Sequence, residues 1–486
     1  MSFQDWMENP PAFLARYDVA NGDWNRFYNR YTAGTQSPPL LRIIEIAVAH
    51  GVQSILVETR YIDADWRSEH ARFYSTTYKR YPSIAHRAHF FTQPLPGDLS
   101  DLSGLVDAYK GYTVFRPIPT QPVGRTMIEP PPELKDAMRC ETTESVDVLG
   151  WRMVVKGMPF VSQDAQYMRC AHADIWMVLR HAFLRRQLGQ RLSSDIHDAT
   201  MGGVIAGREV PSEGLSSYQM MAGLSTLGLS PAILPLPQSK SASDAAGVLG
   251  LFDIVCRYVN SNISPIIVSD NHVWLIVAYA RSASAAHPSL TLYRHDDAAG
   301  PYIRVEDPWN EPASPHQRWK QVMLPLPPKI YMTAERAEEV GKWWFRTWIS
   351  SVAPTNPAVE AHNSNNLTFR TYGIDSSEYK FALATRPGFD PVVAAKYRLT
   401  PLPRNLWVVE AIDRRLRGAQ AEHVLGEVLV DPTASHYTMA HDPGIVAAHA
   451  PGFWWITTPD IAHEDTGTSS ESPYSTGRPD CSSRAF

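Results

Sequence analysis

The segment Met158–Arg180 constrains the fold more than any other part of this sequence, because a polar loop leads there into a cysteine that begins a helix. Apolar residues recur at helical spacing over Ala171–Phe183, which predicts a helix with Cys170 in its first turn. Unpaired N–H groups and the helix dipole favour an anion at that end, so the thiolate is stabilised. An upstream glutamine, Gln163 or Gln166, can offer its side-chain N–H₂ to an oxyanion. A structural cysteine on an amphipathic helix is the alternative interpretation.

The composition excludes several classes of protein. A length of 486 residues allows two to four domains, and 44% hydrophobic with 20% charged residues is ordinary for a soluble globular protein. A net charge of −5 gives no reason to expect a nucleic-acid or anionic-membrane partner. The sequence lacks both the basic and apolar regions of a signal peptide and a run of about 18 apolar residues, so we expect a cytoplasmic protein without a membrane span.

Cysteine usage gives no indication of a metal or disulfide framework. The four cysteines (Cys140, Cys170, Cys256 and Cys481) are widely spaced and form no CxxC pair. Asp63 and Asp65 stand two residues apart without a further ligand motif. We therefore predict no metal and no cofactor. Cys256 lies among apolar residues of a predicted helix and is expected in the core.

The chain divides into four predicted parts. These are an N-terminal α/β accessory domain at 1–140, a central domain at 145–325, a C-terminal β-rich domain at 330–460 and a disordered Ser/Thr/Pro/Gly-rich tail at 461–486. Ten Arg, Lys and His residues between Arg67 and Arg125 either form a basic face or serve a solvated helix surface and structural pairs, and the second interpretation is favoured. Strands of the C-terminal domain are predicted at Leu367–Tyr372, Lys396–Leu399, Asn405–Ile412, His423–Val430 and Gly452–Thr457.

A histidine and an acid follow the cysteine at positions suited to nucleophilic catalysis. His272 begins an apolar run rich in β-forming residues, and Asp307-Pro308-Trp309 ends a later predicted strand, after a turn at Arg294–Gly300. A cysteine nucleophile needs an imidazole partner, and the imidazole needs a third group that fixes its tautomer and orientation. Each feature alone is weakly specific, but their order along the chain is moderately specific.

Residues 150–325 resemble the papain-like cysteine peptidases, in particular the bacterial branch similar to peptidases that remove double-glycine leaders from bacteriocins. The matching residues are Pro159, Gln163, Cys170 and Ala171 before the helix, His272 and Trp274 with Val277–Tyr279 in the histidine strand, and Asp307-Pro308-Trp309. The resemblance implies an α+β fold in which the cysteine helix packs on an antiparallel sheet that bears His272 and the acid. It also implies a nucleophile at Cys170, a base at His272, an orienting Asp307 and an oxyanion donor at Gln163, for which Gln166 is the alternative.

The sequence therefore predicts a cysteine peptidase that cleaves an amide bond of a peptide or protein substrate. Two alternatives remain on the same fold. One is an acyltransferase or transglutaminase-like enzyme, which would pass the acyl group to an amine. The other is a catalytically inactive peptide-binding protein.

Overall fold

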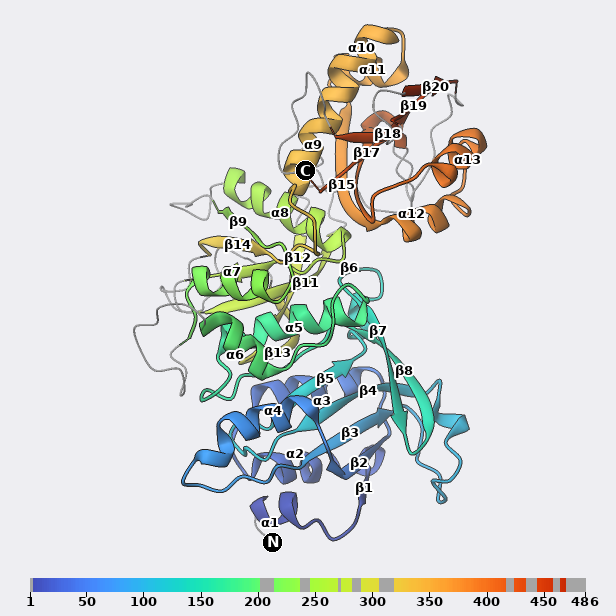
Figure 1. The fold of residues 1–486 in the computed structure, drawn as a ribbon. Coiled ribbons are helices and arrows are strands. Elements are labelled where there is room, and N and C mark those ends of the chain that lie inside the picture. Colours follow the sequence, from blue (N-terminus) through green and yellow to red (C-terminus); the bar gives the residue numbers. More distant parts are fainter. Residues whose placement is uncertain are drawn as a thin grey trace. The chain divides into compact units, whose positions relative to one another are not determined.

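The computed structural model divides the chain into two compact units, which are described separately. The first unit is Met1–Ala242, Ser264–Ala283 and Leu290–Pro328, and the second is Ser243–Ile263, Ser284–Ser289 and Lys329–Phe486. Within them the structure describes residues 3–201, 214–236, 245–269, 272–281, 290–305, 319–416, 424–433, 444–457 and 464–468. Figure 1 shows the elements of both units.

The N-terminal part of the first unit is an antiparallel five-stranded sheet in the order β1-β2-β3-β4-β5. Its strands are β1 (Leu14–Asp18), β2 (Ser54–Tyr61), β3 (Ala85–Phe91), β4 (Tyr109–Phe115) and β5 (Val123–Ile128). Its helices are α1 (Phe3–Glu8), α2 (Trp24–Thr32), α3 (Pro38–Ala49) and α4 (Ala64–Arg72). The Asp63 side chain caps α4 by accepting from the N–H of Trp66, which accounts for that acid without a metal.

The first unit also contains a second, seven-stranded sheet, and His272 directly precedes one of its strands, β11. Its order is β13-β12-β11-β10-β14-β9, and β6 also pairs with β11. The strands are β6 (Met138–Arg139), β9 (Ala232–Pro235), β10 (Ile266–Val268), β11 (Val273–Arg281), β12 (Leu290–Asp296), β13 (Gly300–Val305) and β14 (Gln321–Leu324). Strands β7 (Thr142–Val148) and β8 (Trp151–Gly157) form a separate antiparallel hairpin.

The helix predicted at Cys170 is confirmed as α5 (Cys170–Leu184), and it contacts β11. Helices α6 (Ser193–Met201) and α7 (Ser217–Thr226) lie beside it. Nearly every residue of α5 from Ala171 to Leu179 is buried, including polar His172 and Asp174. A helix that is buried on all sides holds its first residue in a fixed position, which suits a reactive side chain.

The second unit is built on an antiparallel six-stranded sheet in the order β15-β16-β17-β18-β19-β20. The strands are β15 (Leu367–Asp375), β16 (Asn405–Asp413), β17 (Val424–Val430), β18 (Ile445–Ala450), β19 (Phe453–Thr457) and β20 (Glu464–Gly467). The helices are α8 (Ala245–Asn260), α9 (Ala334–Trp343), α10 (Ile349–Val352), α11 (Pro357–Asn363), α12 (Ser376–Leu383) and α13 (Pro391–Leu399). Buried apolar side chains of α12 and α13, such as Tyr379 and Tyr397, form a core with Val408 and Leu429.

The structure is mixed α+β with antiparallel sheets, as predicted, but it differs from the sequence analysis in three places. Lys396–Leu399 ends helix α13 and is not a strand, because Pro391 at the helix start and the Asp390 cap set a helix there. Helix α8 groups with the second unit and not with the rest of 145–325. Residues 464–467 of the tail expected to be disordered form β20, which pairs with β19.

Candidate active site

The structure brings two of the predicted catalytic side chains together. Cys170 is the first residue of α5 and is partly exposed, and His272 directly precedes β11. A hydrogen bond joins the Cys170 thiol to the His272 ring, although the residues are 102 positions apart. The helix start and the strand start meet because α5 packs against β11.

The carboxylate that contacts His272 comes from β12. Oδ1 of Asp296 lies 3.1 Å from Nε2 of His272, and the Asp296 side chain is 6% exposed. Strands β11 and β12 are antiparallel with Leu275 opposite His295, so the last residues of β12 lie beside the residue before β11. Since Nε2 binds Asp296, the nitrogen left for the Cys170 sulfur is Nδ1.

Asp307, the predicted orienting acid, lies outside the described residues. The preceding strand β13 ends at Val305, which is opposite Leu292 of β12, and Leu292 is in turn opposite Tyr279 of β11. The end of β13 therefore lies at the far end of β11 from His272. Among the described residues the orienting position belongs to Asp296, which the sequence analysis assigned to a turn.

The charges around His272 favour its protonated form. Burial alone would lower the pKa of His272, but the hydrogen bonds with Asp296 and Cys170 raise it to about 11. Burial would raise the pKa of Asp296, and the hydrogen bond and positive charge of His272, with Arg294, instead lower it. The ring and Asp296 thus form an ion pair at neutral pH, next to the thiol.

Two further carboxyl groups lie close to this pair. Oδ1 of Asp297 is 3.7 Å from Nε2 of His272, and its side chain is fully buried. Asp174 follows Cys170 by one helical turn and is also fully buried. Burial raises the pKa of Asp297 to about 7, and burial together with the charge of Asp297 raises that of Asp174 well above its usual range. The predicted site included neither residue.

Hydrogen bonds to the Asp164 side chain hold the loop that leads to Cys170. Oδ1 of Asp164 accepts hydrogen bonds of 2.8 Å from the backbone N–H groups of Gln166, Tyr167 and Met168, and its Oδ2 accepts another from the Tyr74 hydroxyl. A carboxylate that satisfies three consecutive N–H groups holds the loop in a single conformation. The same bonds leave the Gln166 side chain exposed.

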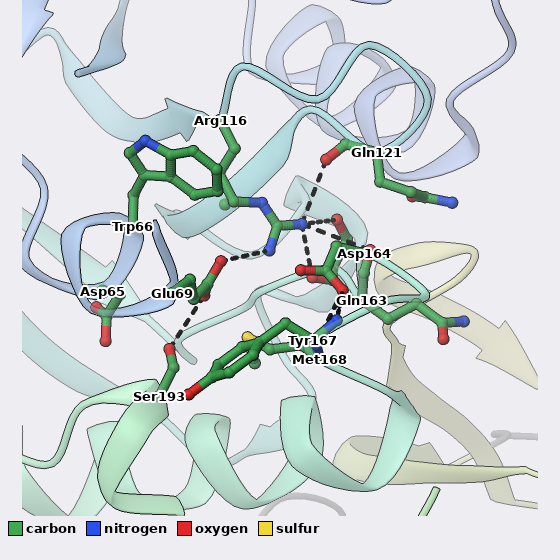
Figure 2. A network of polar contacts seen from close by, with 12 residues as sticks. Asp65, Trp66, Glu69, Arg116, Gln121, Gln163, Asp164, Tyr167, Met168 and Ser193 are labelled. Atoms are coloured by element: carbon green, nitrogen blue, oxygen red, sulfur yellow. Dashed lines mark hydrogen bonds and ion pairs between the residues drawn. The ribbon is translucent and has the colours of Figure 1, made fainter. Parts of the chain in front are cut away.

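Arg116 of the N-terminal sheet connects this loop to the rest of the unit, and Figure 2 shows its guanidinium at the centre of the network. The buried guanidinium donates to the backbone oxygens of Val123 (3.0 Å) and Ser162 (3.0 Å) and contacts Glu69 at 3.4 Å. Burial raises the pKa of Glu69 to about 8, and the charge of Arg116 opposes that rise. Ser193 at the start of α6 donates to Glu69, so the network also reaches α6.

Gln163 contributes its backbone, not its side chain, to the network. Its carbonyl oxygen is 3.5 Å from Nη2 of Arg116, and Figure 2 shows the Gln163 side chain pointing away from that guanidinium. The network therefore does not use the half-buried side chain of Gln163. Basic residues such as Arg87, Arg116 and Arg125 form ion pairs with Glu58, Glu69 and Asp63 respectively, which confirms the prediction of structural pairs for these three.

Comparison of the chain with protein-family models and with curated proteins found no match. No helix in the described part of the chain is both long enough and apolar enough to cross a bilayer.

Proposed function

We propose that the first unit is a cysteine peptidase with a papain-like core. The observation that carries the proposal is the arrangement Cys170–His272–Asp296, in which a helix start, a strand start and the end of the neighbouring strand converge. Sulfur, imidazole and carboxylate in this order form the combination that activates a cysteine nucleophile.

In the proposed reaction the Cys170 thiolate attacks the carbonyl carbon of a substrate amide and forms a tetrahedral intermediate. The backbone N–H of Cys170, in the first turn of α5, and the side-chain amide of Gln163 donate to the oxyanion. The His272 imidazolium then protonates the leaving amine from Nδ1, and the C–N bond breaks. A water molecule, deprotonated by His272, hydrolyses the thioester and regenerates the thiolate.

Asp296 has the orienting role in this mechanism, which the sequence analysis gave to Asp307. Its ionised carboxylate accepts from Nε2 of His272, fixes the tautomer with Nδ1 toward the sulfur, and stabilises the imidazolium. The Asp164 and Arg116 bonds support the same geometry by holding the loop that contains Gln163.

Product analysis tests the proposal. Wild-type protein, Cys170→Ala and the exposed control Asp98→Asn are incubated with a mixed peptide library in H₂¹⁸O, and fragments are identified by mass spectrometry. We expect fragments with ¹⁸O in the new carboxyl group for the wild type and Asp98→Asn, and none for Cys170→Ala. Amine-linked products in place of new carboxyl groups would establish the acyltransferase instead, and equal fragmentation by Cys170→Ala would refute the role of the cysteine.

A further inference from the structure

Three aspartates and one histidine lie near Cys170, whereas a catalytic triad requires only one carboxylate. Asp296 satisfies His272, yet Asp297 and Asp174 are fully buried in the same place. No other residue that the structure describes donates a hydrogen bond to either carboxyl group. Buried polar groups of folded proteins are nearly always paired, so two such carboxyl groups that act electrostatically on each other require an explanation.

The position of Asp174 and the charged groups around it place it beside these residues. It lies on the same face of α5 as Cys170, one turn later. The charged groups that act on it are Asp297, Cys170, His272 and Asp296. Asp296 pairs with His272 and also with Arg294, whose Nη2 lies 3.4 Å from Oδ2 of Asp296. A buried carboxylate without a cation of its own is strongly unfavourable, which is why burial raises the pKa of Asp297 and Asp174. A bound cation would stabilise their ionised forms instead.

The spacing of the donor atoms fits a metal ion. One ligand atom each of His272, Asp296 and Asp297 lies within 4.8 Å of the other two. Nε2 of His272 is 3.1 Å from Oδ1 of Asp296 and 3.7 Å from Oδ1 of Asp297. Tetrahedral zinc, with bonds of about 2.0–2.2 Å, separates neighbouring ligand atoms by roughly 3.3 Å. The two measured separations lie on either side of that value.

The type of donor selects the ion. Imidazole nitrogen and carboxylate oxygen are both ligands of Zn²⁺, whereas Ca²⁺ takes six to eight oxygens and Mg²⁺ retains several waters. A three-residue set leaves a fourth position for a water molecule.

We propose that His272, Asp296 and Asp297 form a Zn²⁺-binding site, and that zinc at this site inhibits the enzyme. The ion would replace the proton on Nε2, and Asp296 would bind the ion instead of the ring. His272 then no longer alternates between imidazole and imidazolium, so it cannot serve Cys170. The inhibition rests on the proposed peptidase function, but zinc binding itself does not.

Calorimetric titration with ZnCl₂ tests the site. The full chain is first dialysed against a chelator, and wild type, Asp297→Asn and the exposed control Asp98→Asn are titrated at neutral pH. We expect wild type and Asp98→Asn to bind one ion that Asp297→Asn does not bind, or binds at least about 10-fold more weakly. Asp296→Asn, which removes another proposed ligand, is measured in parallel and should also bind at least about 10-fold more weakly, so the test still stands if Asp297→Asn fails to fold.

The outcomes separate the metal site from the peptidase. Absence of zinc binding to wild type, or equal binding to wild type and to both cluster variants, overturns the site. Iodoacetamide labelling of Cys170 is measured with chelator and with zinc. Zinc binding with a Cys170 that stays unreactive in chelator refutes the peptidase and leaves the site, whereas a reactive Cys170 that zinc does not slow refutes the inhibition alone.

Discussion

Substitution of Asp296 by asparagine should slow the alkylation of Cys170 by a predictable amount. The bond between Oδ1 of Asp296 and Nε2 of His272 is 3.1 Å long and largely shielded from solvent. A hydrogen bond to a charged group contributes about 1.5–3 kcal/mol. One pKa unit corresponds to about 1.4 kcal/mol, so the pKa of His272 should fall by roughly one to two units. The equilibrium between thiolate–imidazolium and thiol–imidazole shifts by the same factor, about 10- to 100-fold.

The assay measures the iodoacetamide labelling rate of Cys170 by peptide mass spectrometry at pH 7, in the presence of a chelator. We expect Asp296→Asn to label at least about 10-fold more slowly than the wild type, because the imidazolium is held less firmly with Nδ1 toward the sulfur and stabilises the thiolate less. Asp307→Asn is the decisive comparison, since the sequence assigns the same role to that residue. Slow labelling of Asp307→Asn together with a wild-type rate for Asp296→Asn would refute the assignment of Asp296.

Three further predictions concern the groups around the site. Arg116→Met removes the donor to the backbone carbonyls of Gln121, Val123, Ser162 and Gln163 and the ion-pair partner of Glu69, so the free energy of unfolding in urea should fall by roughly 3 kcal/mol or more; a loss below about 1 kcal/mol would contradict the network. Tyr74→Phe should lower the free energy of unfolding by about 1 kcal/mol and Asp164→Ala by about 3 kcal/mol, because Asp164 also accepts hydrogen bonds from three backbone N–H groups. Equal losses in the two variants would show that the loop does not depend on those three hydrogen bonds. The pKa of Asp297 in the folded protein, about 7, exceeds its value in the unfolded chain, so its contribution to stability is lost as pH rises from about 4 to 7. In urea titrations with chelator, Asp297→Asn should show a smaller decline in the free energy of unfolding over that pH range. The same decline in wild type and variant would refute the raised pKa of Asp297.

The sequence predicted the elements of the site better than the contacts between them. Apolar spacing placed the start of α5 at Cys170, and the run of β-forming residues placed His272 before β11, because both are local patterns. The partner of His272 depends on strand pairing. In two successive antiparallel strands, the end of the second strand lies beside the start of the first. Asp296 at the end of β12 and Asp297 directly after it are therefore the acids that the sequence places nearest to His272, which precedes β11. The Asp-Pro pair at Asp307 drew attention to a later strand.

The incorrect predictions of secondary structure have local causes. In Lys396–Leu399 polar and apolar residues alternate, but four residues are too few for this period to distinguish a strand from a helix. The Asp390 cap and Pro391 at the helix start, upstream of this stretch, favour the helix. Arg116, Asp164 and Asp174 could not be assigned from sequence, because each acts through burial and through partners distant along the chain. For Asp174, the sequence offered one indication of a buried polar residue: an acidic side chain within an apolar predicted helix.

The pairing of Cys170 with His272 is tested most directly by the relative reactivity of the cysteines in native protein. Burial raises the pKa of the Cys140 thiol to about 12, so Cys140 provides an internal reference for an unreactive cysteine. With chelator at pH 7, Cys170 should react with iodoacetamide at least about 100-fold faster than Cys140, and His272→Ala should remove most of that difference. A Cys170 that reacts no faster than Cys140, or whose rate is unchanged in His272→Ala, would contradict the proposed active site.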